Sequence, residues 1–236
     1  MSIKSQFKKE CFNIFRSAGF IGLRGNRFIR HSNGIIQVVE FQVSTSTCLC
    51  EVNWGVFPTS TKLASNDIFM CNHHLGEFEN TYGWYKFDPK NDESIQLCVS
   101  NLKLRIMEWL IPFFENCISY DSTYHSLCEF EKATHGEILI ADYSKGILAA
   151  CFKDFALSAL HFDALYQQHE AAMVNNLRSG LTEPRYLSNA KAELDEIKCL
   201  AECAHNSDEV VLLKVMRLNR LHILQALPKP IAKESL

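Results

Sequence analysis

The sequence predicts an α+β protein: an antiparallel sheet of three to five strands packed on two helices, followed by a mostly helical C-terminal region. Two observations lead to this fold class. Residues 19–57 are rich in β-branched and aromatic residues and are punctuated by Gly, Asn and Ser, which is typical of a strand meander. Residues 2–17 and 92–118 repeat apolar residues at helical spacing. We expect a sheet domain over residues 1–121 and a helical region over residues 122–236, or one continuous domain.

The first element is a helix from Ser2 to Ser17. Ile3, Phe7 and Cys11 recur at helical spacing, and charged lysines occupy the other face. We expect this face to pack on the sheet. Gly19 follows at the position where a glycine often ends a helix.

Three antiparallel strands come next. In the second strand, Ile35, Val39 and Phe41 lie on one face, and the residues between them become polar towards Gln42. One face is therefore expected to be apolar and the other partly exposed to solvent. Asn33-Gly34 is a turn signal before this strand. The predicted strands are Asn26–His31, Gly34–Val43 and Thr47–Phe57.

The interval Pro58–Asn80 lacks clear periodicity and is long for a loop, and a loop of that length usually has a function. Thr81–Phe87 is predicted to be a fourth strand or an aromatic turn. The strongest helical pattern runs from Asp92 to Ile118, and Pro112 is expected to kink or interrupt it near Trp109.

The remainder reads as helices. We expect helices over Ser122–Ala133 and Ser144–Ala172, and a third from Thr182 to about His205. Ser207 is expected to cap the last helix, which would form a hairpin with its predecessor.

Composition restricts the function classes. The chain has 236 residues, a net charge of −3 and a pI near 6.3, so nothing drives it towards nucleic acid or anionic lipid. No apolar run reaches the length of a membrane span, and the charged N-terminus is unlike a signal peptide. With ten scattered cysteines, we expect a cytoplasmic protein whose thiols stay reduced.

Cysteines and histidines give one candidate metal site. Cys48 and Cys50 alternate along one strand, and Cys71, His73 and His74 follow in the long interval, so together they supply zinc-type ligands. The alternative is that Cys48 and Cys50 are small core residues beside Trp54. No phosphate loop, dinucleotide fingerprint or nucleophile elbow occurs, so we assign no catalytic residues and expect no cofactor.

Other constellations are weaker. Glu40 and Glu51 lie on neighbouring strands and are expected to be solvated charges on one sheet face. The basic residues around Arg27 and Arg30 would suit a phosphate, but the charge balance argues against nucleic acid. A cluster of aromatic residues is interpreted first as core packing, and it is also the candidate partner-binding surface. Its members are Trp54, Phe57, Phe78, Tyr82, Trp84 and Tyr85.

The order of these elements resembles a known family. Gly19-Phe20, then Asn26–Arg30, then Ile35–Gln42, then Val52–Val56 are similar to segments of the bacterial domain-of-unknown-function family 4304. The resemblance covers about residues 3–120 and implies an α+β unit without established catalytic residues. It does not account for the chain from Ser122 onward.

The sequence favours a non-enzymatic bacterial protein that binds another protein, specifically an immunity or defence-associated protein that neutralises a toxin. Compact size, slight acidity, the missing catalytic motifs and the aromatic cluster lead to this hypothesis. The alternative is a metal-dependent hydrolase or nucleotide-processing enzyme that uses Cys71, His73, His74 and the sheet-face carboxylates. A helical scaffold that dimerises through its C-terminal hairpin is a third possibility.

Overall fold

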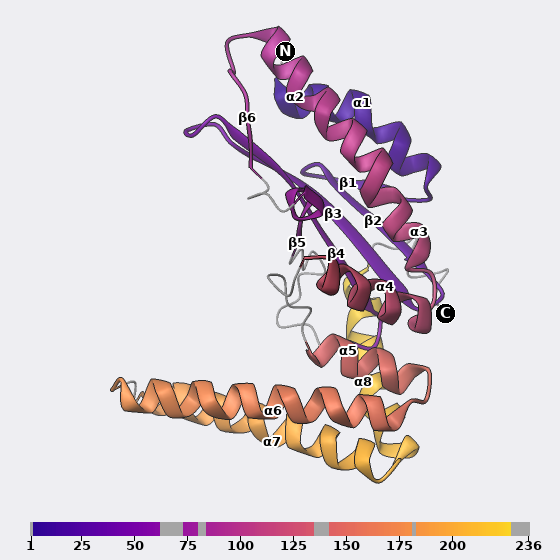
Figure 1. Cartoon of the computed structure of the whole chain (residues 1–236), viewed down its shortest axis with the longest axis vertical. Coiled ribbons are helices and arrows are strands. Elements are labelled where there is room, and N and C mark those ends of the chain that lie inside the picture. Colours follow the sequence, from indigo (N-terminus) through magenta and orange to yellow (C-terminus); the bar gives the residue numbers. More distant parts are fainter. Residues whose placement is uncertain (1, 62–72, 80–83, 135–141, 181–182, 228–236) are drawn as a thin grey trace. The chain divides into compact units, whose positions relative to one another are not determined.

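A computed structural model of the chain describes residues 2–61, 73–79, 84–134, 142–180 and 183–227, without the side chains of Glu79, Leu224 and Ala226 (Figure 1). The fold is α+β, as the sequence predicts. The described chain divides into two compact units. The sheet unit takes in Met1–Thr59, Leu63–Leu139 and Ile223–Leu236, and the helical unit takes in Ser60–Lys62 and Ile140–His222. The division therefore falls later than the predicted boundary at residue 121.

The sheet unit is built on an antiparallel sheet of six strands. The order along the sheet is β1-β2-β3-β4-β5, and β6 pairs with another part of β4. The three long strands lie within two residues of the predicted ones, and the short strands add to them. The strands are β1 Ile21–Leu23, β2 Arg27–Ser32, β3 Ile35–Ser44, β4 Leu49–Pro58, β5 His73–His74 and β6 Tyr85–Lys86.

The predicted alternation along β3 is confirmed. Ile35, Val39 and Phe41 are buried on one face, and the Phe41 ring stacks on Phe7 of α1 (Ile3–Ser17) with centroids 3.9 Å apart. On the other face the strand ends in the exposed Gln42. The N-terminal helix therefore packs on the predicted apolar face. It ends before Gly19, whose φ of +82° suits glycine.

The predicted central helix is three consecutive segments. They are α2 Asp92–Arg105, a π-helical turn η2 Ile106–Leu110, and α3 Ile111–Asn116. Pro112 lies in the first turn of α3, where its missing N–H removes a bond to the carbonyl of Glu108. The Ile111 N–H instead reaches back five residues to Ile106, so the π turn absorbs the interruption.

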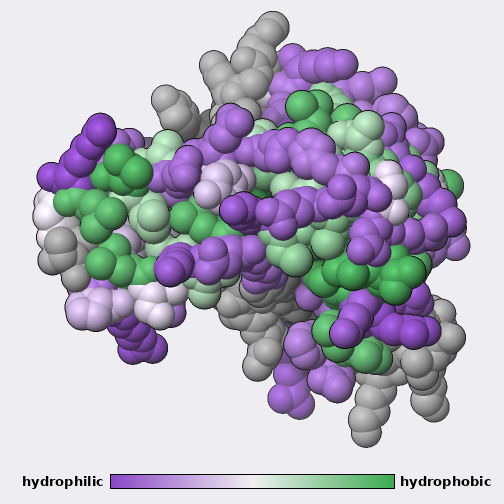
Figure 2. Space-filling model, turned by 90° about the horizontal axis from the view of Figure 1, so that it is seen from below, coloured by the Kyte–Doolittle hydropathy of each residue, from purple (hydrophilic) through white to green (hydrophobic). Residues whose placement is uncertain are grey.

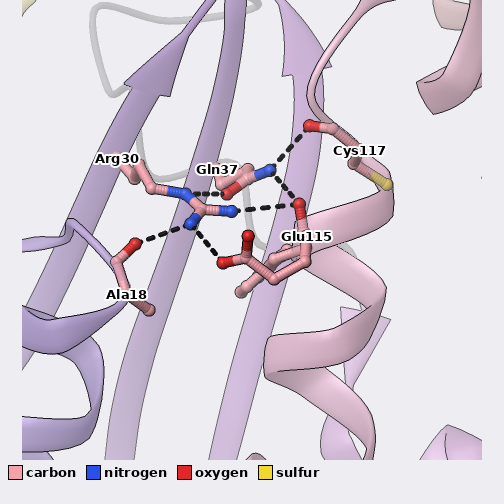
Figure 3. A network of polar contacts seen from close by, with 6 residues as sticks. Ala18, Arg30, Gln37, Glu115 and Cys117 are labelled. Atoms are coloured by element: carbon pink, nitrogen blue, oxygen red, sulfur yellow. Dashed lines mark hydrogen bonds and ion pairs between the residues drawn. The ribbon is translucent and has the colours of Figure 1, made fainter.

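A buried polar network fastens the end of α3 to the sheet (Figure 3). Gln37 of β3 is 1% exposed, and its amide nitrogen donates to the carbonyls of Phe114 at 2.8 Å and Cys117 at 2.7 Å. Arg30 of β2 donates through Nε to Gln37 Oε1 at 2.6 Å, and through Nη2 to Phe114 O at 3.0 Å. Arg30 also donates to Ala18 O and pairs with Glu115 at 2.7 Å. Backbone carbonyls at the C-terminal ends of α1 and α3, which have no partner within their helices, therefore accept hydrogen bonds from Arg30 and Gln37 of the sheet.

Two more segments belong to the sheet unit. The 3-10 helix η1 Leu75–Glu79 directly follows β5. The helix α4 Tyr120–Ala133 starts at a capping box formed by Ser119 and Ser122. Its residue Phe130 packs edge-on against Trp54 of β4 at a centroid distance of 5.3 Å. This contact explains why α4 groups with the sheet.

The helical unit corrects two predictions. The expected helix over Ser144–Ala172 is broken at Lys153, whose φ is +65°, and Asp154 caps the helix that follows. Ser207 does not cap the last helix; Asp208 does, because its carboxylate accepts from the N–H of Val211 at 3.1 Å. The helices are α5 Asp142–Cys151, α6 Phe155–Arg178, α7 Pro184–His205 and α8 Glu209–Ala226, the last of which ends in the sheet unit.

The core of the helical unit lies between the inner parts of these helices. Phe162 of α6 and Leu200 of α7 are buried with Leu212 of α8, and all three belong to one apolar cluster. The α6–α7 pair is the main antiparallel hairpin of this unit (Figure 1). Within the described residues, no helix is long and apolar enough to cross a bilayer.

Candidate functional site

The most distinctive polar site lies where β5 pairs with β4. Asn53 of β4 is directly opposite His74 of β5, so the two side chains share a sheet face with Glu51. His74 Nδ1 is 2.6 Å from Glu51 Oε1 and 2.7 Å from Asn53 Oδ1. The Glu51 side chain is 2% exposed, whereas that of His74 is 43% exposed. A buried carboxylate thus orients a half-exposed imidazole.

The contacts of His74 fix which ring nitrogen carries the proton. Both neighbours of Nδ1 are oxygen acceptors, so Nδ1 must donate, and Nε2 is the nitrogen left for other chemistry. The hydrogen bond to Glu51 raises the pKa of His74, and partial burial opposes that rise. Such a histidine can transfer a proton or hold an anion at Nε2.

His73, the neighbour of His74, is placed differently. It points to the opposite sheet face, where its ring stacks on Trp54 with centroids 4.5 Å apart. Its Nδ1 lies 3.1 Å from Glu77 Oε2, and the residue is 7% exposed. His73 is therefore a core histidine with a carboxylate partner. The two adjacent histidines do not converge on one point.

The predicted metal ligands are not brought together within the described residues. Cys48 lies in the turn before β4 with a φ of +55°, and Cys50 points into the core beside Cys98. His73 and His74 face opposite sides of the sheet. Cys71 lies outside the described residues. In the described part of the chain, no group of three or more His, Cys, Asp or Glu residues could hold a metal ion.

The predicted aromatic surface is largely interior. Trp54 is fully buried and Phe57 is 4% exposed, which removes these two residues from any partner-binding surface. Trp54 shares a sheet face with Val39 and Val52, and that face packs on α3 and α4, so the strand alternation explains its burial. Phe78 and Tyr85 are half-buried and Trp84 is 44% exposed, while Tyr82 lies outside the described residues.

The charged residues of the sheet also differ from expectation. Glu40 and Glu51 share a face, but Glu51 is buried rather than solvated, and Glu40 pairs with Arg27 at 2.6 Å. The Arg30 side chain is 11% exposed and engaged in the network of Figure 3. Arg27 and Arg30 are therefore occupied by the fold itself.

A second polar cluster, in the helical unit, has no signal in the sequence. Asp142 of α5 accepts from His161 Nδ1 at 3.0 Å and from Gln168 at 2.9 Å, and lies 3.3 Å from Lys145 Nζ. His161 and Asp163, two residues apart on α6, contact different partners. Asp163 instead pairs with His205 at 2.8 Å. The Asp142 cluster ties α5 to α6.

The outer half of the α6–α7 hairpin is an open surface of the helical unit that carries apolar side chains. From Tyr166 to Gly180 and from Glu183 to Glu193, no residue is buried. The outer half nevertheless carries Val174 and Leu177 at 36% and 38% exposure. Figure 2 shows apolar residues at its left end, where the outer end of the α6–α7 hairpin lies in Figure 1. Further half-buried members are Met173, Tyr186, Leu187 and Ala190.

Comparison with known proteins gives no relative. No protein-family model, no curated protein and no solved structure matches the chain. The resemblance to family 4304 therefore stays a prediction, and the function has to be argued from the geometry alone.

Proposed function

We propose that this chain is a non-enzymatic protein that binds another protein, and that the outer half of the α6–α7 hairpin is its docking surface. The observation that carries the proposal is the burial pattern along the hairpin. The inner half buries Phe162, Leu194 and Ile197, whereas the outer half buries no described residue although it keeps apolar side chains. Two helices alone cannot cover both of their apolar stripes, so a third element is expected to cover them.

Interactions within the hairpin favour a preformed surface. Asn176 of α6 donates to the Tyr186 hydroxyl of α7 at 2.5 Å, and His169 lies 3.7 Å from Glu193. These contacts hold the two helices together beyond the buried inner half. A rigid surface loses less entropy on binding than a flexible one.

The charges of the outer half indicate how a partner would bind. Between residues 166 and 193, Arg178, Arg185 and Lys191 balance Glu170, Glu183 and Glu193. A surface without net charge gives no long-range steering, so we expect association to depend only weakly on salt. The partner is expected to present a complementary apolar stripe, as an amphipathic helix does.

The specific form that we propose is an immunity or defence-associated protein of the bacterial cytoplasm that covers and neutralises a toxin. The resemblance to a bacterial family and the slight net acidity support this form. The nine cysteines among the described residues are all free, which agrees with a reducing compartment.

The test compares Val174→Asp and Leu177→Asp with Asn175→Asp, which adds the same charge to a polar exposed position of the same helix. Tagged variants are used to purify partners from the native cell, and the toxicity of each partner is measured with and without this chain. We expect the two apolar variants to lose a toxic partner and its neutralisation, and Asn175→Asp to keep both. Equal recovery by all variants, or a partner without toxicity, would refute the proposal.

A second candidate function rests on the Glu51–His74 pair. A buried carboxylate that contacts Nδ1, with Nε2 as the remaining ring nitrogen, is the arrangement that general acid–base catalysis uses. This supports the hydrolytic or nucleotide-processing alternative. The test measures hydrolysis of phosphomonoesters, phosphodiesters and nucleotides, with and without added zinc, for the wild type and for His74→Gln. Turnover that His74→Gln abolishes would replace the binding proposal, and no turnover under any condition removes the enzyme.

A further inference from the structure

Two cysteines meet in the core of the sheet unit. Cys50 on β4 and Cys98 on α2 bring their sulfur atoms to 3.4 Å, and the residues are 0% and 6% exposed. Cys50 also lies 3.5 Å from the carbonyl of Tyr85 on β6. The two sulfurs come from segments that are 48 residues apart in the chain. The fold, rather than local sequence, creates this contact.

The pair is chemically unlike the isolated buried cysteines. Burial raises the pKa of Cys11, Cys117 and Cys151 to about 12 each, so these thiols stay protonated and unreactive. The hydrogen bond with Cys50 lowers the pKa of Cys98, and the charge of Arg105 acts in the same direction. The same hydrogen bond raises the pKa of Cys50. Cys50 also donates to the carbonyl of Tyr85, so either sulfur can be the donor within the pair, and the charge of Arg105 favours negative charge on Cys98.

We propose that Cys50 and Cys98 are a modification site for hydrogen peroxide, at which the two thiols form a reversible disulfide that joins β4 to α2. The Cys98 thiolate attacks one peroxide oxygen; the O–O bond breaks, hydroxide leaves, and Cys98 becomes a sulfenic acid. The Cys50 sulfur then attacks the Cys98 sulfur and water leaves. In total, two thiols and one peroxide give one disulfide and two waters.

The surroundings select the oxidant and the product. Hydrogen peroxide is little larger than water, whereas the low exposure of both residues excludes bulky disulfides such as oxidised glutathione. A sulfenic acid in contact with a second thiol is trapped as a disulfide before further oxidation. Closing the sulfur–sulfur distance from 3.4 Å to about 2 Å requires side-chain rotation and a small backbone shift. The inference does not depend on the proposed partner.

Mass spectrometry of the full-length protein tests the proposal. The protein is treated with hydrogen peroxide, unfolded, alkylated with N-ethylmaleimide and digested with trypsin. We expect two fewer alkylated cysteines than the ten of the untreated protein. The tryptic peptides 31–62 and 91–103 should be linked, and dithiothreitol should separate them.

Cysteine variants identify which cysteine is linked to Cys98, since peptide 31–62 contains both Cys48 and Cys50. The link should survive in Cys48→Ser and disappear in both Cys50→Ser and Cys98→Ser. A link that requires Cys48 would overturn the proposal, as would oxidation confined to the peptide 199–214, which holds Cys199 and Cys203. Sulfinic or sulfonic acid at Cys98 without a link would also overturn it. So would an unchanged pair at a peroxide dose that fully oxidises free glutathione.

Discussion

Replacing Gln37 by alanine tests whether the network of Figure 3 holds the sheet to α3. The change removes the bonds from Gln37 to the carbonyls of Phe114 and Cys117, and the one that Gln37 accepts from Arg30. The two neutral bonds contribute about 1 kcal/mol each, and the bond from the charged Arg30 contributes about 1.5 to 2 kcal/mol. The Cys117 carbonyl and Arg30 Nε would be left in a buried site. We expect the free energy of unfolding of the sheet unit to fall by about 3 to 4 kcal/mol.

The matched control is Gln42→Ala, because Gln42 is the same residue type on the same strand but is exposed. Urea unfolding followed by tryptophan emission is the assay, since Trp54, Trp84 and Trp109 all lie in the sheet unit. With a slope of about 2 kcal/mol per molar urea, Gln37→Ala should lower the midpoint by roughly 1.5 to 2 M. If Gln37→Ala costs no more than Gln42→Ala, the network is not what fastens α3.

Two further predictions concern single residues of the sheet unit. Because Glu51 raises the pKa of His74, the ion pair should be fully present below about pH 6.5 and lost as the pH rises through the raised value. Loss of the ion pair should lower the free energy of unfolding by about 1 kcal/mol or less after solvent screening. In His74→Gln the free energy of unfolding should no longer fall with pH over this range. In Gly34→Ala the new methyl group would collide with Tyr120 in a turn with a φ of +83°, so we expect a cost of about 2 kcal/mol or more in thermal unfolding. Gly25→Ala has a similar φ of +79° and open space, and should cost about 1 kcal/mol; equal costs would contradict the steric argument.

Much of the sheet unit could be predicted because its signals are local. The alternation along Ile35–Val43 identifies both faces of β3, and Asn33-Gly34 places the turn before it. Pro112 indicates that the central helix is interrupted. The form of the interruption, a π turn from Ile106 to Leu110, depends on neighbours that the sequence does not reveal. The break at Lys153 was missed because apolar residues on both sides of it serve one core, which keeps their helical spacing.

The candidate site was harder to predict because its parts are distant in sequence. The pairing of His74 with Glu51 requires β5 to return beside β4, and no periodicity in Pro58–Asn80 indicates that return. Residue type made Trp54 a candidate for a partner-binding surface, although core packing was the stronger interpretation. Its position in the alternation with Cys50 and Val52 would have placed it in the core. The contact between Cys50 and Cys98 depends on the tertiary fold in the same way.

The arrangement of the strands also limits association between the sheets of different molecules. The two longest strands, β3 and β4, pair with each other over their whole length, and the short β1, β5 and β6 cover parts of the outer edges of β2 and β4. A strand of two or three residues offers too few open peptide groups to template a neighbouring molecule. We therefore expect the native sheet to resist growth into fibrils, and cross-β assembly to begin after these short strands detach.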